Sequence, residues 1–289
     1  MATTSTQGFA GLRSNLEITG LQSATVSTRQ TNVRDAVAAH MDVVDSFLTG
    51  SYMRSTMIAP LKEADIDIFI VLDVSYYHNL AGPAALLDKV KRELKKTYPT
   101  TPRISRNGQA VTISFTDFDV DVVPGFYRTG GGYLIPDSVR NTWIPTDPKQ
   151  HVIIWAAENK KHNGNLIPLI KMLKRWNKKH SALLQSFHLE ALILNILDGI
   201  TISDFPSGVR YVFDKARMAV QYPIPDPAGY NNNIGGYIDT DEKLLEICNR
   251  LERATLQARE AESLDASGNT RRAFEKWRTI FGDYFPAYG

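Results

Sequence analysis

The apolar residues in the first half of the chain follow helical spacing in some segments and a continuous extended pattern in others. Residues 65–72 form a short run rich in isoleucine and valine, which predicts a buried strand. Residues 83–98 carry leucine and valine at helical spacing and stop at Pro99, which predicts an amphipathic helix. The same spacing predicts a helix at about residues 33–44. Helix and strand therefore alternate in this part of the chain.

Between residues 111 and 123 the apolar positions change parity. Odd positions are apolar in the first part of this segment and even positions in the second. One regular strand cannot show this change, because a slip of one residue exchanges the two faces of a strand. We therefore expect two paired strands joined by a turn near Thr116-Asp117, and the second strand is expected to end at Pro124.

Helical spacing dominates the second half of the chain. Helices are predicted at residues 148–161, 166–180, 186–197, 240–264 and 271–281. The first residues are polar and contain no long apolar run, so we expect a frayed segment there. The predicted organisation is a flexible tail at residues 1–28, a mixed α/β lobe at 29–147 and a helical lobe at 148–289, with a cleft between the lobes.

Composition excludes several classes of protein. Of 289 residues, 43% are hydrophobic and 22% are charged, which rules out a disordered or fibrous chain. The net charge of +2 does not predict specific binding to DNA. The single cysteine, Cys248, excludes an intramolecular disulfide and a cysteine-based zinc site. Because no secretory signal and no stretch of roughly 20 apolar residues is present, we expect a cytoplasmic protein that binds no membrane.

Four aspartates stand in the two segments that predict strands. Asp65 and Asp67 open the first, and Asp119 and Asp121 lie in the second. Residues i and i+2 of a strand point to the same face about 6.6 Å apart, so such carboxylates can converge on one pair of cations. Oxygen ligands favour Mg²⁺ or Mn²⁺, and two such ions about 3.5 to 4 Å apart serve phosphoryl transfer. The alternative is a solvent-exposed strand end whose carboxylates cap backbone amides.

A glycine-serine pair, Gly50-Ser51, lies upstream of these aspartates at a predicted turn into a helix. Glycine permits close approach of the backbone, and a serine hydroxyl with free helix amides can hold triphosphate oxygens. An ordinary turn with a helix N-cap is the alternative interpretation of the pair. Together with the aspartates, the pair predicts a nucleotide site that uses metal ions.

These motifs resemble the signature of a known superfamily. Gly50-Ser51, the Asp-Ile-Asp of residues 65–67 and the Val-Asp-Val-Val-Pro of residues 120–124 resemble the polymerase-β-like nucleotidyltransferases. Residues 169–177 and 186–190 resemble the branch that holds oligoadenylate synthetases, cGAS and the bacterial cGAS/DncV-like nucleotidyltransferases. Asp226-Pro227 with Asn231-Asn232-Asn233, and the closing segment from Phe274 to Pro286, resemble the bacterial group most.

The resemblance implies an α+β fold. It consists of a polymerase-β-like nucleotidyltransferase lobe, a mixed sheet with flanking helices, and a helical lobe of the oligoadenylate synthetase/cGAS type, with the active site in the cleft between them. It also implies that Asp65, Asp67 and Asp121 hold two Mg²⁺ ions, with Mn²⁺ as a possible substitute, and that Asp121 lies beside the attacking hydroxyl. Asp119 competes with Asp121 for the third position because it shares its face.

Three residues of the helical half match nucleotide-binding positions of the family. The resemblance implies that Lys174 contacts the donor triphosphate and that Ser186 is its partner at the next helix start. Phe187 stands where relatives often have a tyrosine that stacks on a base, and phenylalanine can stack without donating a hydrogen bond. The alternatives are an N-cap role for Ser186 and a core position for Phe187.

The implied function is a template-independent nucleotidyltransferase. It would join ATP or other nucleoside triphosphates into a cyclic or linear oligonucleotide second messenger, release pyrophosphate and act in bacterial anti-phage signalling. A separate effector protein would read the product, and an activating protein partner is possible. One alternative is transfer of a nucleotide to an RNA end, a protein or a small molecule, and another is an inert nucleotide- or RNA-binding module.

Overall fold

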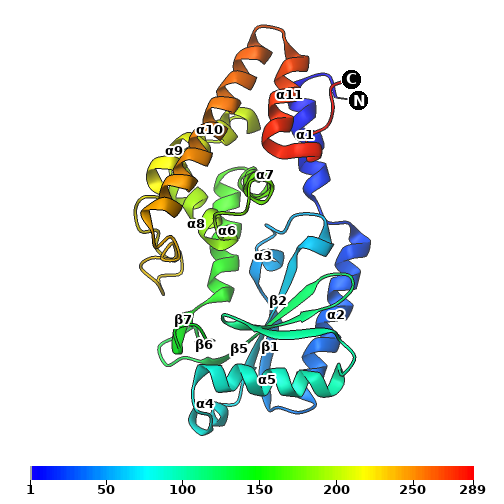
Figure 1. Ribbon diagram of the computed structural model, residues 1–289, viewed down its shortest axis with the longest axis vertical. Coiled ribbons are helices and arrows are strands. Elements are labelled where there is room, and N and C mark those ends of the chain that lie inside the picture. Colours follow the sequence, from blue (N-terminus) through cyan, green and yellow to red (C-terminus); the bar gives the residue numbers. More distant parts are fainter. Residues whose placement is uncertain (1) are drawn as a thin grey trace. The chain divides into compact units, whose positions relative to one another are not determined.

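The computed structural model describes residues 2–289, which form two compact units. One unit is Ile18–Ile153, and the other combines the residues up to Glu17 with Ile154–Gly289. Figure 1 shows the elements of both. In the part of the chain that is described, no helix is long and apolar enough to cross a membrane.

The unit Ile18–Ile153 is built on a mixed sheet of seven strands. Five of them lie in the order β1-β2-β5-β4-β3, and β6 pairs with both β5 and β7. The strands are β1 (Val43–Leu48), β2 (Asp65–Leu72), β3 (Arg103–Asn107), β4 (Ala110–Ser114), β5 (Asp119–Tyr127), β6 (Tyr133–Asp137) and β7 (Thr142–Thr146). The pairing of β2 with β5 is parallel, whereas the other pairs are antiparallel.

Side-chain alternation along β2 gives the sheet two different faces. Ile66, Ile68 and Ile70 point into the main core, where they pack with Val120 and Val122 of β5 and with apolar residues of α2 (Gly20–Ala38) and α5 (Pro83–Thr97). The opposite face carries the aspartates at the start of β2. Further along that face, Phe69 packs in a smaller aromatic cluster.

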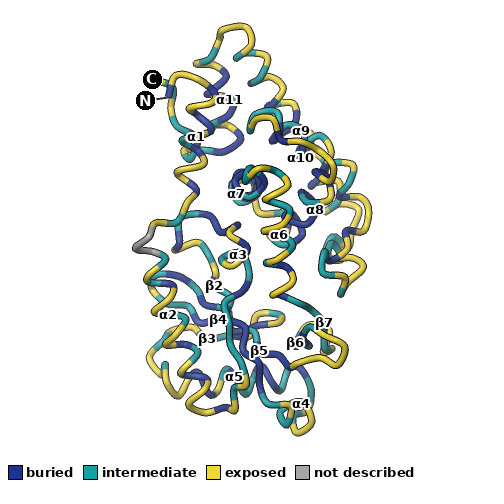
Figure 2. Tube along the Cα trace, turned by 180° about the vertical axis from the view of Figure 1, so that it is seen from behind, coloured by how far each residue is buried: buried dark blue, intermediate teal, exposed yellow. Residues whose placement is uncertain are grey.

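The other unit is helical. Its elements are α1 (Ser5–Leu16), most of α6 (Pro148–Lys161), α7 (Leu166–Lys179), α8 (Ser186–Leu197), α9 (Phe205–Ala219), α10 (Asp241–Ala266), α11 (Thr270–Phe281) and the 3₁₀ turn η2 (Gly282–Tyr284). Most of α7 is buried (Figure 2). Phe9 of α1 packs edge-on against Trp277 and Phe285, and Ala2 pairs with Tyr288 beside the two chain ends marked in Figure 1. The first helix is therefore anchored to the last residues of the chain.

The structure confirms several predicted elements and changes others. The strand at residues 65–72 is β2, and the parity change corresponds to β4 and β5, paired with Val111 opposite Val122. The N-terminal residues expected as a flexible tail form α1 and the first part of α2 instead, apart from Met1, which lies outside the described residues. The helix expected at 33–44 ends at Ala38, and β1 begins at Val43. The helix expected to begin at Gly50-Ser51 is the short α3 (Gly50–Met53). The prediction missed β1, β3, α9 and the β6–β7 hairpin, as well as the short elements α4 (Ser75–Asn79) and η1 (Leu61–Glu63).

Candidate active site

The parallel register of β2 and β5 places four aspartates in one array. Asp65 lies opposite Asp119, and Asp67 lies opposite Asp121. Because residues i and i+2 share a face, all four lie on the face of the sheet opposite the main core. Neighbouring strands are about 4.8 Å apart, so the pairs are cross-strand neighbours. The residues that sequence reasoning selected, Asp65, Asp67 and Asp121, are thus brought together, and Asp119 with them.

The Asp121 carboxyl has a raised pKa. Its pKa is raised to about 6, chiefly by burial and also by the negative charges of Asp65 and Asp119, while a hydrogen bond from Thr112 opposes the shift. Thr112 Oγ1 donates that bond to Asp121 Oδ1 at 2.5 Å, from the position directly opposite on β4. Thr112 therefore fixes the orientation of the Asp121 carboxylate. The predicted pairing of the two strands about Thr116-Asp117 brings residue 112 opposite residue 121, but this side-chain hydrogen bond was not predicted.

Gly50 lies against the same array. The backbone N–H of Thr49 donates to the carbonyl oxygen of Asp67 at 2.9 Å, which ties the end of β1 to β2. Gly50 follows with φ +63°, and a Cβ at this position would collide with the Asp67 carboxylate. Here glycine is required both by the left-handed backbone and by the close approach. The N-cap of the single-turn helix α3 is Thr49, and Ser51 lies within the helix.

The donor chemistry of the array fits a divalent cation. Carboxylate oxygens are the ligands that Mg²⁺ and Mn²⁺ prefer, and a cation would offset the mutual repulsion that raises the pKa of Asp121. Within residues 2–289, however, no three histidine, cysteine, aspartate or glutamate side chains are arranged as a complete ligand group. The two-ion site on Asp65, Asp67 and Asp121 therefore stays a prediction.

Lys174 belongs to the helical unit, where it is buried. Its Nζ donates to Glu190 Oε1 at 3.0 Å, with 8% of the lysine side chain and none of the glutamate side chain exposed. Lys171, one turn earlier on α7, contacts Glu17 Oε2 at 2.6 Å. The sequence did not predict Glu190 as the partner of Lys174, because the pair joins α7 to α8 and the packing of these two helices was not known from the sequence. The predicted contact of Lys174 with a triphosphate stays a prediction.

Ser186 and Phe187 open α8 in the same unit as Lys174. Ser186 is exposed and is the first helical residue, since the N-cap is Gln185 rather than Ser186. Phe187 is half-buried and stacks on Trp155, with ring centroids 5.7 Å apart and an interplanar angle of 19°. An aromatic ring with one face on a buried tryptophan is held in a fixed orientation. The structure thus gives Phe187 a packing role and leaves its predicted nucleotide contact as a prediction.

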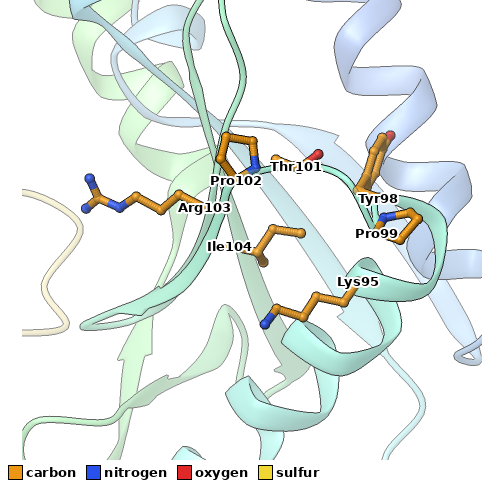
Figure 3. A pocket seen from close by; sticks show the side chains of 7 residues that line it. All are labelled: Lys95, Tyr98, Pro99, Thr101, Pro102, Arg103 and Ile104. Atoms are coloured by element: carbon orange, nitrogen blue, oxygen red, sulfur yellow. The ribbon is translucent and has the colours of Figure 1, made fainter.

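A cavity of about 390 Å³ lies elsewhere in the unit Ile18–Ile153 (Figure 3). Its walls come from the end of α5, the following loop and the start of β3. The lining residues are Lys95, Tyr98, Pro99, Thr101, Pro102, Arg103 and Ile104. None of the residues predicted for catalysis or nucleotide binding is among them, so this cavity plays no part in the candidate site.

Comparison with known proteins gives one consistent result. A protein-family model described as "Second Messenger Oligonucleotide or Dinucleotide Synthetase domain" matches residues 1–159. A similar sequence is the cyclic AMP-AMP-AMP synthase of Acinetobacter sp. (strain ATCC 27244 / 9458), which is 27% identical over 98% of this chain and 86% of its own length.

Two solved structures of CdnC from E. coli MS115-1 share the fold. The structure with ATP has a TM-score of 0.77 and 16% identity, and the match covers 98% of this chain and 99% of that one. The complex with HORMA-deltaN has a TM-score of 0.76 and 16% identity, and the match covers 98% of both chains. The predicted α+β fold, with one unit built on a mixed sheet and one helical unit, is thereby confirmed.

Proposed function

The chain belongs to the Second Messenger Oligonucleotide or Dinucleotide Synthetase family, that is, to the bacterial cGAS/DncV-like nucleotidyltransferases, and from this premise we propose that it makes a cyclic oligonucleotide from nucleoside triphosphates. The predicted nucleotidyltransferase activity in second-messenger synthesis is confirmed by the family. The cyclic product, the residues that carry the reaction and the partners are our proposal.

The parallel register of β2 and β5 is the observation that carries the proposal for the site. Asp65, Asp67 and Asp121 would hold two divalent ions, and Gly50 would keep the backbone close to the Asp67 carboxylate. When bound, such ions supply activation of an attacking hydroxyl and neutralisation of charge on the transferring phosphate and the leaving pyrophosphate. Thr112 orients Asp121 through its hydrogen bond. Catalysis would rest on positioning and charge neutralisation.

ATP is the substrate that we propose first. The similar Acinetobacter protein is a cyclic AMP-AMP-AMP synthase, and one solved structure of CdnC contains ATP. Lys174 would contact the triphosphate, Ser186 would assist it, and Phe187 would stack on a base. Because Lys174 is paired with Glu190 in this structure, the lysine would have to share or exchange that partner when nucleotide binds.

We also propose a protein activator and an anti-phage role. A complex of CdnC with HORMA-deltaN is among the similar structures, which supports an activating protein partner for this chain. The product would then act on a separate effector protein, since a diffusible oligonucleotide transmits a signal only if another protein binds it.

The reaction is tested with purified protein, all four nucleoside triphosphates and Mg²⁺ or Mn²⁺, followed by phosphatase treatment and mass spectrometry. A phosphatase-resistant oligonucleotide is expected with the unchanged protein and not with Asp65→Ala/Asp67→Ala. Incorporation of nucleotide only when an RNA, protein or small-molecule acceptor is added would instead show transfer to that acceptor. Binding of ATP with no pyrophosphate release, even with an activating partner present, would contradict the proposal.

A further inference from the structure

One phenol joins the loop between α9 and α10 to the first turn of α8. The backbone N–H of Gln185 donates to the hydroxyl oxygen of Tyr237 at 2.9 Å. The same oxygen lies 2.9 Å from Nδ1 of His188, with which it shares a second hydrogen bond. Gln185 is the N-cap of α8 and His188 is its third helical residue. Tyr237 therefore connects the two ends of the turn that carries Ser186 and Phe187.

This arrangement resembles a capping box in which the acceptor comes from another segment. In an ordinary capping box, a glutamate or glutamine at the third helical position accepts a hydrogen bond from the N–H of the N-cap. Here the third position is His188, and the Gln185 N–H is satisfied by Tyr237 instead. The side chain of Gln185 makes no capping hydrogen bond of its own. The start of α8 thus depends on residue 237, far along the chain.

The contact is partly buried and closely packed, since His188 is buried, Tyr237 is half-buried and Gln185 is exposed. His188 is 2% exposed, and its ring meets the Tyr237 ring edge-on, with centroids 5.6 Å apart. A Cβ at Gly235 would lie 2.9 Å from His188 Cε1, so only glycine lets the loop approach this closely. Burial lowers the pKa of His188 to about 4 and raises that of Tyr237 to about 12, which keeps both groups neutral near pH 7.

The loop that supplies Tyr237 is itself held by internal hydrogen bonds. The N–H of Asp226 donates to the carbonyl of Asn231 at 2.7 Å, and the N–H of Ile234 donates to the carbonyl of Ile224 at 2.8 Å. The side chain of Asn233 accepts from the N–H of Gly235 at 2.9 Å. Residues of the Asp226-Pro227 and Asn231-Asn232-Asn233 motifs thus close the loop by hydrogen bonds, and the closed loop positions Tyr237.

We propose that Tyr237 is a positioning residue for nucleotide binding, which holds the first turn of α8 so that Ser186 and Phe187 are presented in a fixed orientation. This inference rests on the proposed function for the role of those two residues. Loss of the Tyr237 hydroxyl would remove this partner from the Gln185 N–H and from His188 Nδ1. Since His188 is buried, an unpaired Nδ1 there is costly. The turn would then open more often, and the bound nucleotide would lose its contacts there.

The test compares Tyr237→Phe with the matched control Tyr222→Phe, whose ring is 68% exposed on the same loop. Hydrogen exchange by mass spectrometry should show about tenfold faster exchange of the amides of residues 185–188 in Tyr237→Phe, the factor that corresponds to ~1.4 kcal/mol. The KM for ATP should rise about fivefold to tenfold, while kcat changes less than about twofold. Tyr222→Phe should leave both quantities unchanged.

Two results would overturn the inference. Unchanged exchange at residues 185–188 in Tyr237→Phe would show that the hydroxyl does not hold the turn. Faster exchange with an unchanged KM would show that the turn does not position nucleotide. If the unchanged protein makes no product, the proposed function fails separately, because exchange and the Kd for ATP still report on Tyr237 without turnover.

Discussion

The backbone of Gly50 lies directly against the carboxylate of Asp67. Any side chain at residue 50 would fill the space that this carboxylate takes, and the positive φ of Gly50 excludes most other residues as well. This contact places the turn after β1 against the aspartates of β2.

Gly50→Ala should therefore abolish activity by displacing Asp67. We expect pyrophosphate release to fall at least about 100-fold, because a small displacement of a catalytic group costs that much. The matched control is Gly108→Ala, since Gly108 has a similar φ of +60° with nothing near its Cβ position. Both variants carry backbone strain of about 1 kcal/mol, whereas only Gly50→Ala also brings a Cβ against the Asp67 carboxylate. Equal activity in the two variants would contradict the role of the Gly50–Asp67 contact.

The two candidates for the third carboxylate can be separated by single substitutions. Asp121→Asn should reduce kcat by about 100-fold or more at saturating Mg²⁺, because it removes a metal-binding oxygen charge at the reacting centre. Asp119→Asn should reduce it by less than about tenfold if Asp119 only adds charge beside the site. Pyrophosphate release measured over a range of Mg²⁺ concentrations checks both. A larger effect of Asp119→Asn would assign the third position to Asp119.

Asp121 should make folding stability depend on pH in a definite direction. Its pKa rises from about 3.8 in the unfolded chain to about 6 in the folded protein, so the folded state binds the proton more tightly. The stabilising effect of protonation is fully present below pH 4 and is lost as the pH rises through 6. Without metal, Asp121→Asn should raise the free energy of unfolding at pH 7.5 by roughly 1 to 3 kcal/mol.

Urea unfolding in the presence of a chelator measures this effect. The advantage of Asp121→Asn over the unchanged protein should shrink toward zero at pH 4, since both then carry a neutral group at residue 121. Other titrating groups are common to the two proteins and cancel in the difference. A lower stability of the variant at pH 7.5 would show that the carboxylate is better accommodated than its burial and neighbours indicate.

The buried Lys174–Glu190 pair allows the structural and functional roles of the lysine to be separated. Lys174→Met should destabilise the protein by about 3 to 5 kcal/mol, because it removes the cation that faces a fully buried glutamate. Lys174→Met/Glu190→Met should recover most of that loss. If Lys174 also contacts the triphosphate, the double variant should fold well and still show a KM for ATP raised about tenfold. A stable double variant with normal KM would confine Lys174 to packing.

The central strands could be predicted from the sequence because their patterns are local. The isoleucine-rich run gives β2 its observed bounds, and the parity change gives the turn between β4 and β5. The predicted end at Pro124 is wrong, since β5 continues to Tyr127. On the side of β5 away from β2, the residues up to Val122 pair with β4 and those from Phe126 pair with β6. Pro124 lies between these two stretches, so the N–H that it lacks removes no hydrogen bond to β4 or β6.

The parts that sequence reasoning missed depend on distant partners. The first residues are polar and were therefore predicted to be a tail. In the structure Phe9 and Leu12 are buried in the helical unit, whose other elements begin more than a hundred residues later. Tyr237 acts through a hydrogen bond to Gln185 on another element, 52 residues away in the chain, and the spacing of residues does not predict such a contact. The candidate carboxylates could be predicted because each strand carries two aspartates at positions i and i+2. When the two strands are neighbours, a single register brings both pairs of aspartates together.

The association of α1 with the end of the chain has a consequence for synthesis on the ribosome. Phe9 is synthesised more than 260 residues before its partners Trp277, Phe281 and Phe285. At roughly 5 to 20 residues per second, α1 must wait tens of seconds for them. During that interval Ile18–Ile153 can already fold as a unit of its own. The helical unit is thus completed late, and a nascent chain arrested before α11 would leave Phe9 of α1 without Trp277, Phe281 and Phe285, so that chaperones could bind it.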